Sequence, residues 1–456
     1  MTQPNLPSPR QPRLAAWVAR WGPILPLLAA ELIVWLGFGA LLPIMPLYFT
    51  EHGVRLETLG VVIAAWPAAR LIGEPIFGWI ADRTERVPLM VGGLLVTAIA
   101  LGLPLVFNAP LEFVALRALA GLATSLYDPA ARGFLTDATP PERRGEAFGL
   151  FGAAQMAGLL LGPAIGGLGS AVFGGVAFVF GFGAFATFIA ALAVALRVRE
   201  SAQIGRHGPI APAYDITEFP TEPPLVYRRA ADDAYAEESV GPDDATELGA
   251  DPATSTPRSL WNRRLAAAIV LNLGGYFAGG IYEVIWSLFL QAKGAGLDLI
   301  GLTFAMFALP VLFLSPFAGR LVDRRGPFAF VAIGSLMTAT ASFIYPLLGD
   351  PVHVVPFIIL EGTGFAISNP ALYSIVASGS PRGRSSTAQG IFGASGTIGT
   401  IVASIGAGYL AGVDLRYPFW VAGSVLVTLL LVGLVVGGRA IRTLAPARPH
   451  LDPAPT

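Results

Sequence analysis

The sequence predicts an all-α membrane protein whose twelve transmembrane helices form two pseudo-symmetric six-helix bundles. Of the 456 residues, 54% are apolar and 13% are charged, and the mean hydropathy is +0.64. One soluble domain cannot bury so much apolar surface, so lipid must be the solvent. Twelve stretches are also long enough to cross a bilayer, and matching residues recur at an offset of 241 positions, as Gly78 and Gly319 do (319 − 78).

The individual spans follow from length, because about twenty apolar residues cross a bilayer as a helix. In the first half, near-uncharged stretches of this length occupy 23–49, 59–80, 87–107, 113–135, 147–172 and 176–196. In the second half they occupy 265–290, 299–321, 328–348, 354–376, 388–410 and 417–436. We therefore expect five regions: an N-terminal tail (1–22), a first bundle (23–198), a linker (199–262), a second bundle (263–438) and a C-terminal tail (439–456).

The linker differs in composition from both bundles. It is rich in Pro, Ala, Asp and Glu, with acidic pairs such as Asp232-Asp233 and Asp243-Asp244. Such a segment cannot bury enough apolar surface to fold, so it is predicted to be a disordered cytoplasmic spacer. A recognition patch around Tyr227 is the alternative to a plain spacer.

The repeat extends through both bundles. The same offset pairs Pro75 with Pro316, Gly121 with Gly362, Pro129 with Pro370, Gly149 with Gly390 and Phe151 with Phe392. Duplicated membrane halves commonly build one central site, and rocking one half against the other opens that site to each side in turn. Transport by alternating access is therefore the first functional hypothesis.

Arginines distinguish the two sides of the membrane. One face collects most of them, including Arg20, Arg83, Arg143, Arg197, Arg263, Arg324 and Arg439, whereas the opposite loops hold mainly Arg55, Lys293 and Arg416. Positive loops mark the cytoplasmic face, so we expect a multi-pass protein of the plasma (cytoplasmic) membrane with both termini in the cytoplasm. The chain has no cysteine, which excludes disulfides and thiolate metal sites.

A loop motif supports the transport hypothesis. Residues 78–86 read GWIADRTER, and 319–326 read GRLVDRRG. The first resembles the loop between the second and third helices of the major facilitator superfamily, and the copy resembles its weaker repeat. The glycine would let a helix approach closely, and the aspartate would pair with arginines in one rocking state. The expected gating residues are Gly78, Asp82, Arg83, Arg86, Gly319, Asp323 and Arg324; a loop without a gating role is the alternative.

A second motif indicates a subclass. Its residues are Gly158, Gly162, Pro163, Gly166 and Gly167, in the pattern G-x-x-x-G-P-x-x-G-G. The pattern resembles the fifth-helix motif of the twelve-helix drug:proton antiporters in this superfamily. The offset of 241 leads to Gly399, Ala403, Ser404, Ala407 and Gly408, so the motif is one-sided. Glycines four apart make a groove for another helix, which would suppress leak between the halves; ordinary small-residue packing is the alternative.

Polar residues within the spans follow three stripes of helical spacing: Arg117, Gly121, Thr124 and Asp128; Glu31, Trp35 and Phe38; Asn272, Tyr276 and Glu283. Arg117 with Gly121 resembles the R-x-x-x-G motif on the fourth helix of proton-coupled members of the superfamily. Asn272 is the repeat equivalent of Glu31, so the last two stripes are expected to face each other and line a substrate cavity.

Glu31 is the predicted proton carrier, because its position in the first span resembles that of an acidic residue in some multidrug antiporters. An apolar environment favours the protonated form of a carboxyl, so Glu31 would bind a proton outside and release it inside. Substrate would occupy the cavity when the carboxylate is free. Arg117 would stabilise the anion and Asp128 is a relay candidate; a static pair of Glu31 with an arginine is the alternative.

The remaining charged residues in the spans have local interpretations. Arg70 and Glu74 are four residues apart and are expected to form an ion pair, with a gate as the second possibility. Asp128 has Arg132 at the same spacing, so a local pair is as well supported as a relay. Glu283 and Glu361 have no local cation, which makes each a candidate for binding a cationic substrate or a second proton.

Aromatic residues in the predicted cavity favour amphipathic or cationic organic compounds as substrates. We expect a monomeric, proton-coupled efflux antiporter of multidrug type, with protons and membrane lipids as partners but no nucleic acid, cofactor or metal. A lipid or lysolipid transporter, a uniporter or symporter of a small organic solute, and a receptor or scaffold acting through the acidic linker are the alternatives. No enzyme is expected, because the four histidines lie in loops, tails or a span edge and no nucleophile–base set emerges.

Overall fold

The computed structural model describes residues 17–18, 20–140, 143–173, 175–199, 261–380 and 385–442. Within these ranges every regular element is a helix, so the all-α prediction is confirmed. Most of the predicted linker (199–262) and of the two predicted tails (1–22 and 439–456) lies outside the described residues.

The helices of the first half are α2 (Leu25–Leu41), α3 (Met45–Glu51), α4 (Leu56–Ala81), α5 (Arg86–Gly102), α6 (Pro110–Asp137), α7 (Arg144–Val172) and α8 (Phe178–Arg197). Those of the second half are α10 (Arg263–Ala292), α11 (Leu297–Arg325), α12 (Phe328–Ile344), α13 (Val355–Gly379), α14 (Ser385–Val413) and α15 (Tyr417–Arg442). Short 3-10 turns η1 (Leu103–Leu105), η4 (Tyr345–Leu347) and η5 (Pro351–Val354) complete the described elements.

Twelve spans account for these helices. Ten described helices are long and apolar enough to cross a membrane, and the bent pair α2 and α3 forms an eleventh span. The twelfth is α6, which has 28 residues but carries several charged side chains along its length. The predicted first span, 23–49, is thus two helices at 46° to each other. The break contains Pro43, whose ring displaces a helical carbonyl and which cannot donate a backbone hydrogen bond.

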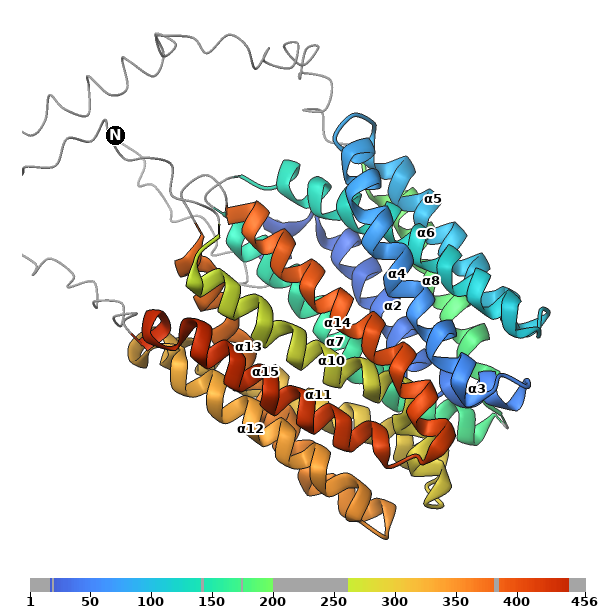
Figure 1. Cartoon of the computed structure of the whole chain (residues 1–456). Helices are drawn as coiled ribbons and strands as arrows, with labels where there is room; N and C mark the ends of the chain where they lie inside the picture. Colours follow the sequence, from blue (N-terminus) through green and yellow to red (C-terminus); the bar gives the residue numbers. More distant parts are fainter. Residues whose placement is uncertain are drawn as a thin grey trace, which may run out of the picture. The chain divides into compact units, whose positions relative to one another are not determined.

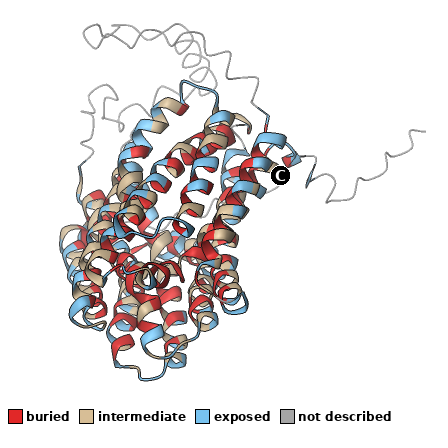
Figure 2. Ribbon diagram, turned by 90° about the vertical axis from the view of Figure 1, so that its right-hand side faces the viewer, coloured by how far each residue is buried: buried red, intermediate tan, exposed pale blue. Residues whose placement is uncertain are grey.

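The outer surface of the bundle is apolar. Figure 2 shows buried residues gathered in the interior and exposed residues on the outside of the helices. Many of the exposed side chains are large and apolar; Val435 is 87% exposed and Phe185 is 64% exposed. Such a surface would aggregate in water and matches a lipid environment. The chain is therefore a multi-pass membrane protein.

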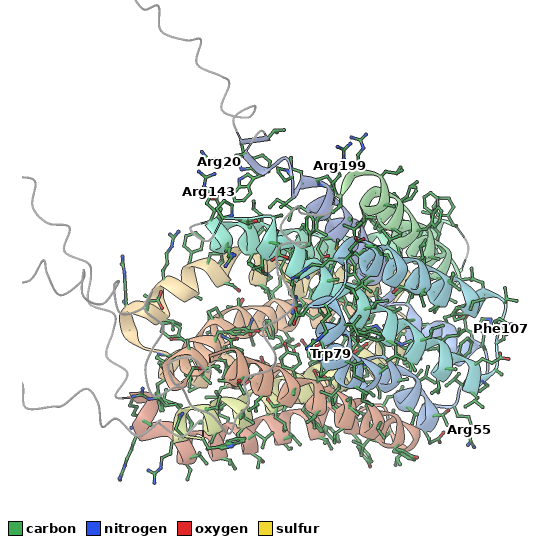
Figure 3. All side chains as sticks on the ribbon, turned by 90° about the horizontal axis from the view of Figure 1, so that it is seen from above. Arg20, Arg55, Trp79, Phe107, Arg143 and Arg199 are labelled. Atoms are coloured by element: carbon green, nitrogen blue, oxygen red, sulfur yellow. The ribbon has the colours of Figure 1, made fainter. Side chains whose placement is uncertain are left out.

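Charged side chains divide the two ends of the bundle. Figure 3 shows Arg20, Arg143 and Arg199 at one end, and Arg55 with Phe107 at the other. We call these the arginine-rich end and the opposite end.

The two halves meet at the opposite end through two equivalent helix pairs, α4 with α14 and α7 with α11 (Figure 1). In the first pair, Gly60 lies against the backbone of Ser404, and Gly408 lies against Leu56 and Gly60. In the second pair, Gly167 lies against Leu297 and Gly301, where an added Cβ atom would stand 2.5 Å from the Leu297 carbonyl oxygen.

The repeat explains this symmetry, because Gly60 and Gly301 are equivalent positions, as are Gly167 and Gly408. All four are glycines since any side chain would separate the two backbones. At the arginine-rich end, a third pair of repeat-equivalent glycines, Gly78 and Gly319, makes no such contact between the described residues of the halves. Gly78 and Gly319 each approach only a proline of their own half, Pro129 and Pro370, at 3.9 Å from an added Cβ atom. The halves are therefore in close backbone contact at the opposite end.

Candidate functional site

A cavity of about 460 Å³ lies between the two halves. Its wall is mainly aromatic and aliphatic, with two carboxylates, Glu283 and Glu361. Five of the predicted substrate-cavity residues line it: Trp35, Phe38, Tyr276, Glu283 and Glu361. Thr124 instead lines a small void inside the first half, and Asn272 lines a separate chamber inside the second half.

An ion pair crosses from one half to the other at this cavity. Arg117 on α6 lies 3.6 Å from the Oε1 atom of Glu283 on α10, and both side chains are largely buried. The sequence contains no cation near Glu283, so the partner from the other half is a finding of the structure. The structure likewise places Arg117 with Glu283 rather than with Glu31. The pair leaves Arg117 Nε and Glu283 Oε1 without a hydrogen bond to any described residue, so its geometry is open to rearrangement.

Exchanging the two charges tests this pair. Either single reversal, Arg117→Glu or Glu283→Arg, puts like charges together and should lower the thermal stability of the purified protein. The double reversal should recover part of that loss, with a coupling energy of about 1–2 kcal/mol. Thermal unfolding of the four proteins in detergent measures it; additive single effects would show that the two charges do not interact.

The second carboxylate, Glu361 on α13, is held by a tyrosine. Tyr345 donates a hydrogen bond of 2.7 Å to Glu361 Oε2. Tyr282 and Trp286 on α10 lie beside Tyr345, and the Trp286 and Tyr345 rings are 4.8 Å apart. Glu361 makes no ion pair with any described residue, so it is an uncompensated acid at the cavity wall.

Glu31 lies behind the cavity wall and is fully buried. Three side chains donate to its carboxylate: Trp35 Nε1 at 2.9 Å and Gln155 Nε2 at 2.5 Å to Oε1, and the Tyr127 hydroxyl at 2.5 Å to Oε2. No described cation pairs with it. Of the three donors, Trp35 also lines the cavity, so the indole connects the carboxyl to the substrate space.

Arg70 joins two acids near the Glu31 cluster. It pairs with Glu74 on its own helix α4 and with Asp128 on α6, whose Oδ2 atom lies 2.5 Å away. Asp128 is thus bound to Arg70 across two helices instead of to the neighbouring Arg132. This contact fixes α4 against α6 and leaves Arg132 exposed.

The described contacts of Gly78, Arg83 and Arg86 in the predicted gating motif are made within the first half. Arg83 stacks on Trp79, 4.0 Å from the ring centre, and Arg86 pairs with Asp137 of α6 at 3.0 Å. Asp82 forms no ion pair with a described residue. In the second copy, Asp323 and Arg324 likewise form no ion pair with a described residue.

The antiporter motif on α7 makes two kinds of contact. Helix α2 packs against Gly158, Gly162 and Gly166 through Trp35, Leu36 and Ala40. Helix α11 of the second half packs against Gly167. At Gly162, an added Cβ atom would stand 2.6 Å from the Leu36 carbonyl oxygen. Of the motif glycines, only Gly167 lies against a described residue of the other half, and its repeat equivalent, Gly408, is also a glycine; the Pro163 carbonyl lies against Gly301 at the same contact.

Several site residues were missed in the sequence. Tyr127 and Gln155 bind Glu31, yet neither belongs to a motif or shares its helix. A comparison of the two repeats could have indicated them, because both residues change in the second half. The equivalents of Tyr127 and Gln155 are Ser368 and Gly396, and the equivalent of Glu31 is Asn272. Glu31, Tyr127 and Gln155 are therefore each replaced by a different residue type at the equivalent position in the second half.

Comparison with known proteins gives the family. The sequence profile described as Major Facilitator Superfamily matches residues 27–285 and 268–454. Among curated relatives, Multidrug resistance protein 2 of Bacillus subtilis (strain 168) is 23% identical over 88% of this chain and 92% of its own length. Quinolone resistance protein NorA of Staphylococcus aureus (strain MRSA252) is 27% identical over 30% of this chain and 35% of its own length. The chain thus matches about a third of NorA.

Solved structures share the fold at low sequence identity. The nucleoside transporter NupG has a TM-score of 0.68 at 14% identity, covering 90% of this chain and 99% of NupG. A bacterial homologue of the human lysosomal transporter Spinster, inward-facing and unoccupied, has a TM-score of 0.65 at 15% identity, covering 92% and 95%. With the profile matches over both halves, these results show that the chain belongs to the Major Facilitator Superfamily of membrane transporters.

Proposed function

We propose that the protein is a proton-coupled efflux antiporter that exports amphipathic organic cations across the cytoplasmic membrane. The observation that carries this proposal is the cavity between the halves, in which aromatic rings surround two carboxylates. Aromatic faces and carboxylates together attract an organic cation. The similarity to a multidrug resistance protein and to a quinolone resistance protein supports the same substrate class.

Glu361 is the carboxylate that meets the charge of the substrate. Glu283 is already compensated by Arg117, whereas Glu361 is hydrogen-bonded by tyrosine hydroxyls but has no cation partner among the described residues. A charge buried without a counter-ion is costly, and an arriving cation would remove that cost. Tyr282 and Trp286 line the cavity beside it and offer ring faces to the apolar part of the substrate.

Glu31 carries the proton in this proposal. Its dehydrated position suits a neutral carboxyl, while its three donors suit a carboxylate, so both forms are tolerated. Because Glu31 does not itself line the cavity, substrate acts on it through Trp35. A cation stacked on the Trp35 ring would alter the hydrogen bond to Glu31 and favour release of its proton.

The proton gradient supplies enough energy for this exchange. A pH difference equivalent to about 150 mV yields roughly 3.5 kcal/mol for each proton. Because one-for-one exchange with a monovalent cation moves no net charge, the membrane potential itself does not contribute. This energy supports a substrate gradient of roughly a few hundredfold.

The arginine-rich end is assigned to the cytoplasm, with both termini on that side. The close glycine contacts at the opposite end then make this state inward-facing. In the outward-facing state, the glycine contacts between the halves at the opposite end separate. Asp82 and Arg83 then approach the second half at the arginine-rich end.

Transport in sealed proteoliposomes with an imposed pH gradient tests the function. Adding tetraphenylphosphonium should collapse the gradient at a rate that depends on the protein, because each cation exchanged moves protons the other way. Lysolipid serves as the comparison substrate. A gradient that persists with tetraphenylphosphonium bound, or that responds only to lysolipid, would contradict cation–proton antiport.

A further inference from the structure

Beside the main cavity, a chamber of about 260 Å³ lies wholly within the second half, between α10, α11, α12, α13 and α15. The two spaces share Tyr276, Gly279, Tyr282, Phe307 and Glu361 in their walls. Glu361 therefore stands at the boundary between them. A molecule bound at this carboxylate can extend into either space.

The chamber is lined by polar groups that lack protein partners. The side chains of Ser335 and Thr338 on α12 and of Asn369 on α13 make no hydrogen bond with any described residue. Asn272 donates to the Phe392 carbonyl at 2.8 Å and to Ser395 at 3.2 Å, and its own carbonyl oxygen accepts no hydrogen bond from a described residue. Ser335, Thr338 and Asn369 are half-buried and line the chamber with unused hydrogen-bonding capacity, which a polar occupant would satisfy.

The repeat shows that the chamber is specific to the second half. The equivalent position in the first half is a void of about 40 Å³, lined for the most part by counterparts of the chamber residues. There Val34, Phe38 and Tyr127 fill the space, whereas the chamber has Gly275, Gly279 and Ser368 at the equivalent positions.

The polar groups differ in the same way. In the first half, Thr97 donates to the Gly93 carbonyl at 2.8 Å and Asp128 is bound by Arg70. Their counterparts Thr338 and Asn369 make no side-chain hydrogen bond with a described residue, and Asn369 has no arginine to bind it, because the position equivalent to Arg70 is Val311. In the first half the space is filled and Thr97 and Asp128 are bound by protein groups, while the second-half chamber is open and has unused donors and acceptors.

We propose that this chamber is a second substrate subsite, which holds an uncharged hydrogen-bonding arm of a substrate whose cation lies at Glu361. The preferred substrates are two-part molecules: a quaternary ammonium group that carries aryl rings, joined to an amide, hydroxyl or ether. The ammonium and its rings occupy the main cavity, and the arm passes Tyr276 and Phe307 to reach Asn369 and Thr338. The proposal rests on the cation-binding part of the proposed function.

Filling the chamber with the first-half residue gives a direct test. Gly275 lines the chamber but not the main cavity, and an added Cβ atom would meet nothing within 4 Å. Gly275→Val therefore restores the side chain of Val34 without a backbone clash. Gly92→Val on α5 is the matched control, because Gly92 is equally open and lines none of these cavities.

Two probes separate the subsite from the main cavity. Denatonium is a quaternary ammonium with an amide arm, and tetraphenylphosphonium is a cation without any hydrogen-bonding group. Dissociation constants are measured on the purified protein in detergent, where no proton gradient exists. Gly275→Val should weaken denatonium binding about tenfold and Thr338→Val about fivefold, the latter equivalent to one net hydrogen bond. Tetraphenylphosphonium binding should change less than about twofold in both.

The outcomes distinguish the two proposals. Equal effects on both probes, or no effect on denatonium, would overturn the subsite while leaving cation transport intact. Another outcome is that the variants show the expected fold-changes in probe binding while the parent protein moves no protons. In that case antiport fails and the subsite stands. A parent protein that binds neither probe would contradict both.

Discussion

Glu31→Gln is expected to retain cation binding but to lose proton-driven transport. Glutamine keeps the size of the side chain and can still accept from Trp35 and Gln155, whose nitrogens donate to the Glu31 carboxylate. It cannot bind and release a proton, so the coupling step is removed. Accumulation of tetraphenylphosphonium in inside-out proteoliposomes should fall from roughly a few hundredfold to equality across the membrane.

Two variants make this result specific. Glu112→Gln alters an exposed carboxyl that accepts only from the Ala109 amide at the start of α6, and it should transport like the parent. Glu361→Gln should weaken cation binding, yet any cation it does carry should still be exchanged for protons. Gradient-driven accumulation by Glu31→Gln at the parental level would remove Glu31 from the mechanism.

Arg70→Met is expected to cause the largest loss of stability. Arg70 is the shared partner of Glu74 and Asp128, and Asp128 is buried, with a relative exposure of 9%. Methionine preserves the apolar stem but leaves the Asp128 carboxylate without a cation. Removing one partner of a buried ion pair costs about 3–5 kcal/mol, which thermal unfolding in detergent would reveal as a clear downward shift.

A second substitution should restore much of this stability. Arg70→Met with Asp128→Asn removes the buried charge as well as its partner, so the double variant should be more stable than Arg70→Met alone. Arg83→Met serves as a surface control, since Arg83 stacks on the Trp79 ring and donates an exposed hydrogen bond to the Trp79 carbonyl oxygen, and its loss should cost less than about 1 kcal/mol. If the double variant is no more stable than Arg70→Met, an unpaired Asp128 is not the cause of the loss.

Patterns along the chain predicted the features that depend on local spacing or on the repeat. Hydropathy gave the spans, and the offset of 241 positions predicted the two-bundle fold. The spacing of Arg70 and Glu74 predicted a contact within one helix. The break at Pro43 was missed, because the stretch from 23 to 49 is apolar throughout and hydropathy does not register a bend.

Patterns along the chain did not predict which residues pair between helices. Asp128 binds Arg70, and Glu283 binds Arg117, although each acid lies far from its partner along the chain. These pairings depend on how α4, α6 and α10 pack, and helix spacing fixes only which residues share a face. Similarly, the glycines that replace Val34 and Phe38 in the second half are visible in the sequence, but the chamber they open follows from packing in three dimensions.

Proton release on substrate binding tests the central claim most directly. The purified protein is mixed with tetraphenylphosphonium in weakly buffered detergent solution near neutral pH, and a pH-sensitive dye reports any protons released. The parent protein should release up to one proton for each cation bound, whereas Glu31→Gln should bind the cation without releasing one. Cation binding by the parent with no proton release, or equal release by Glu31→Gln, would contradict coupling through Glu31.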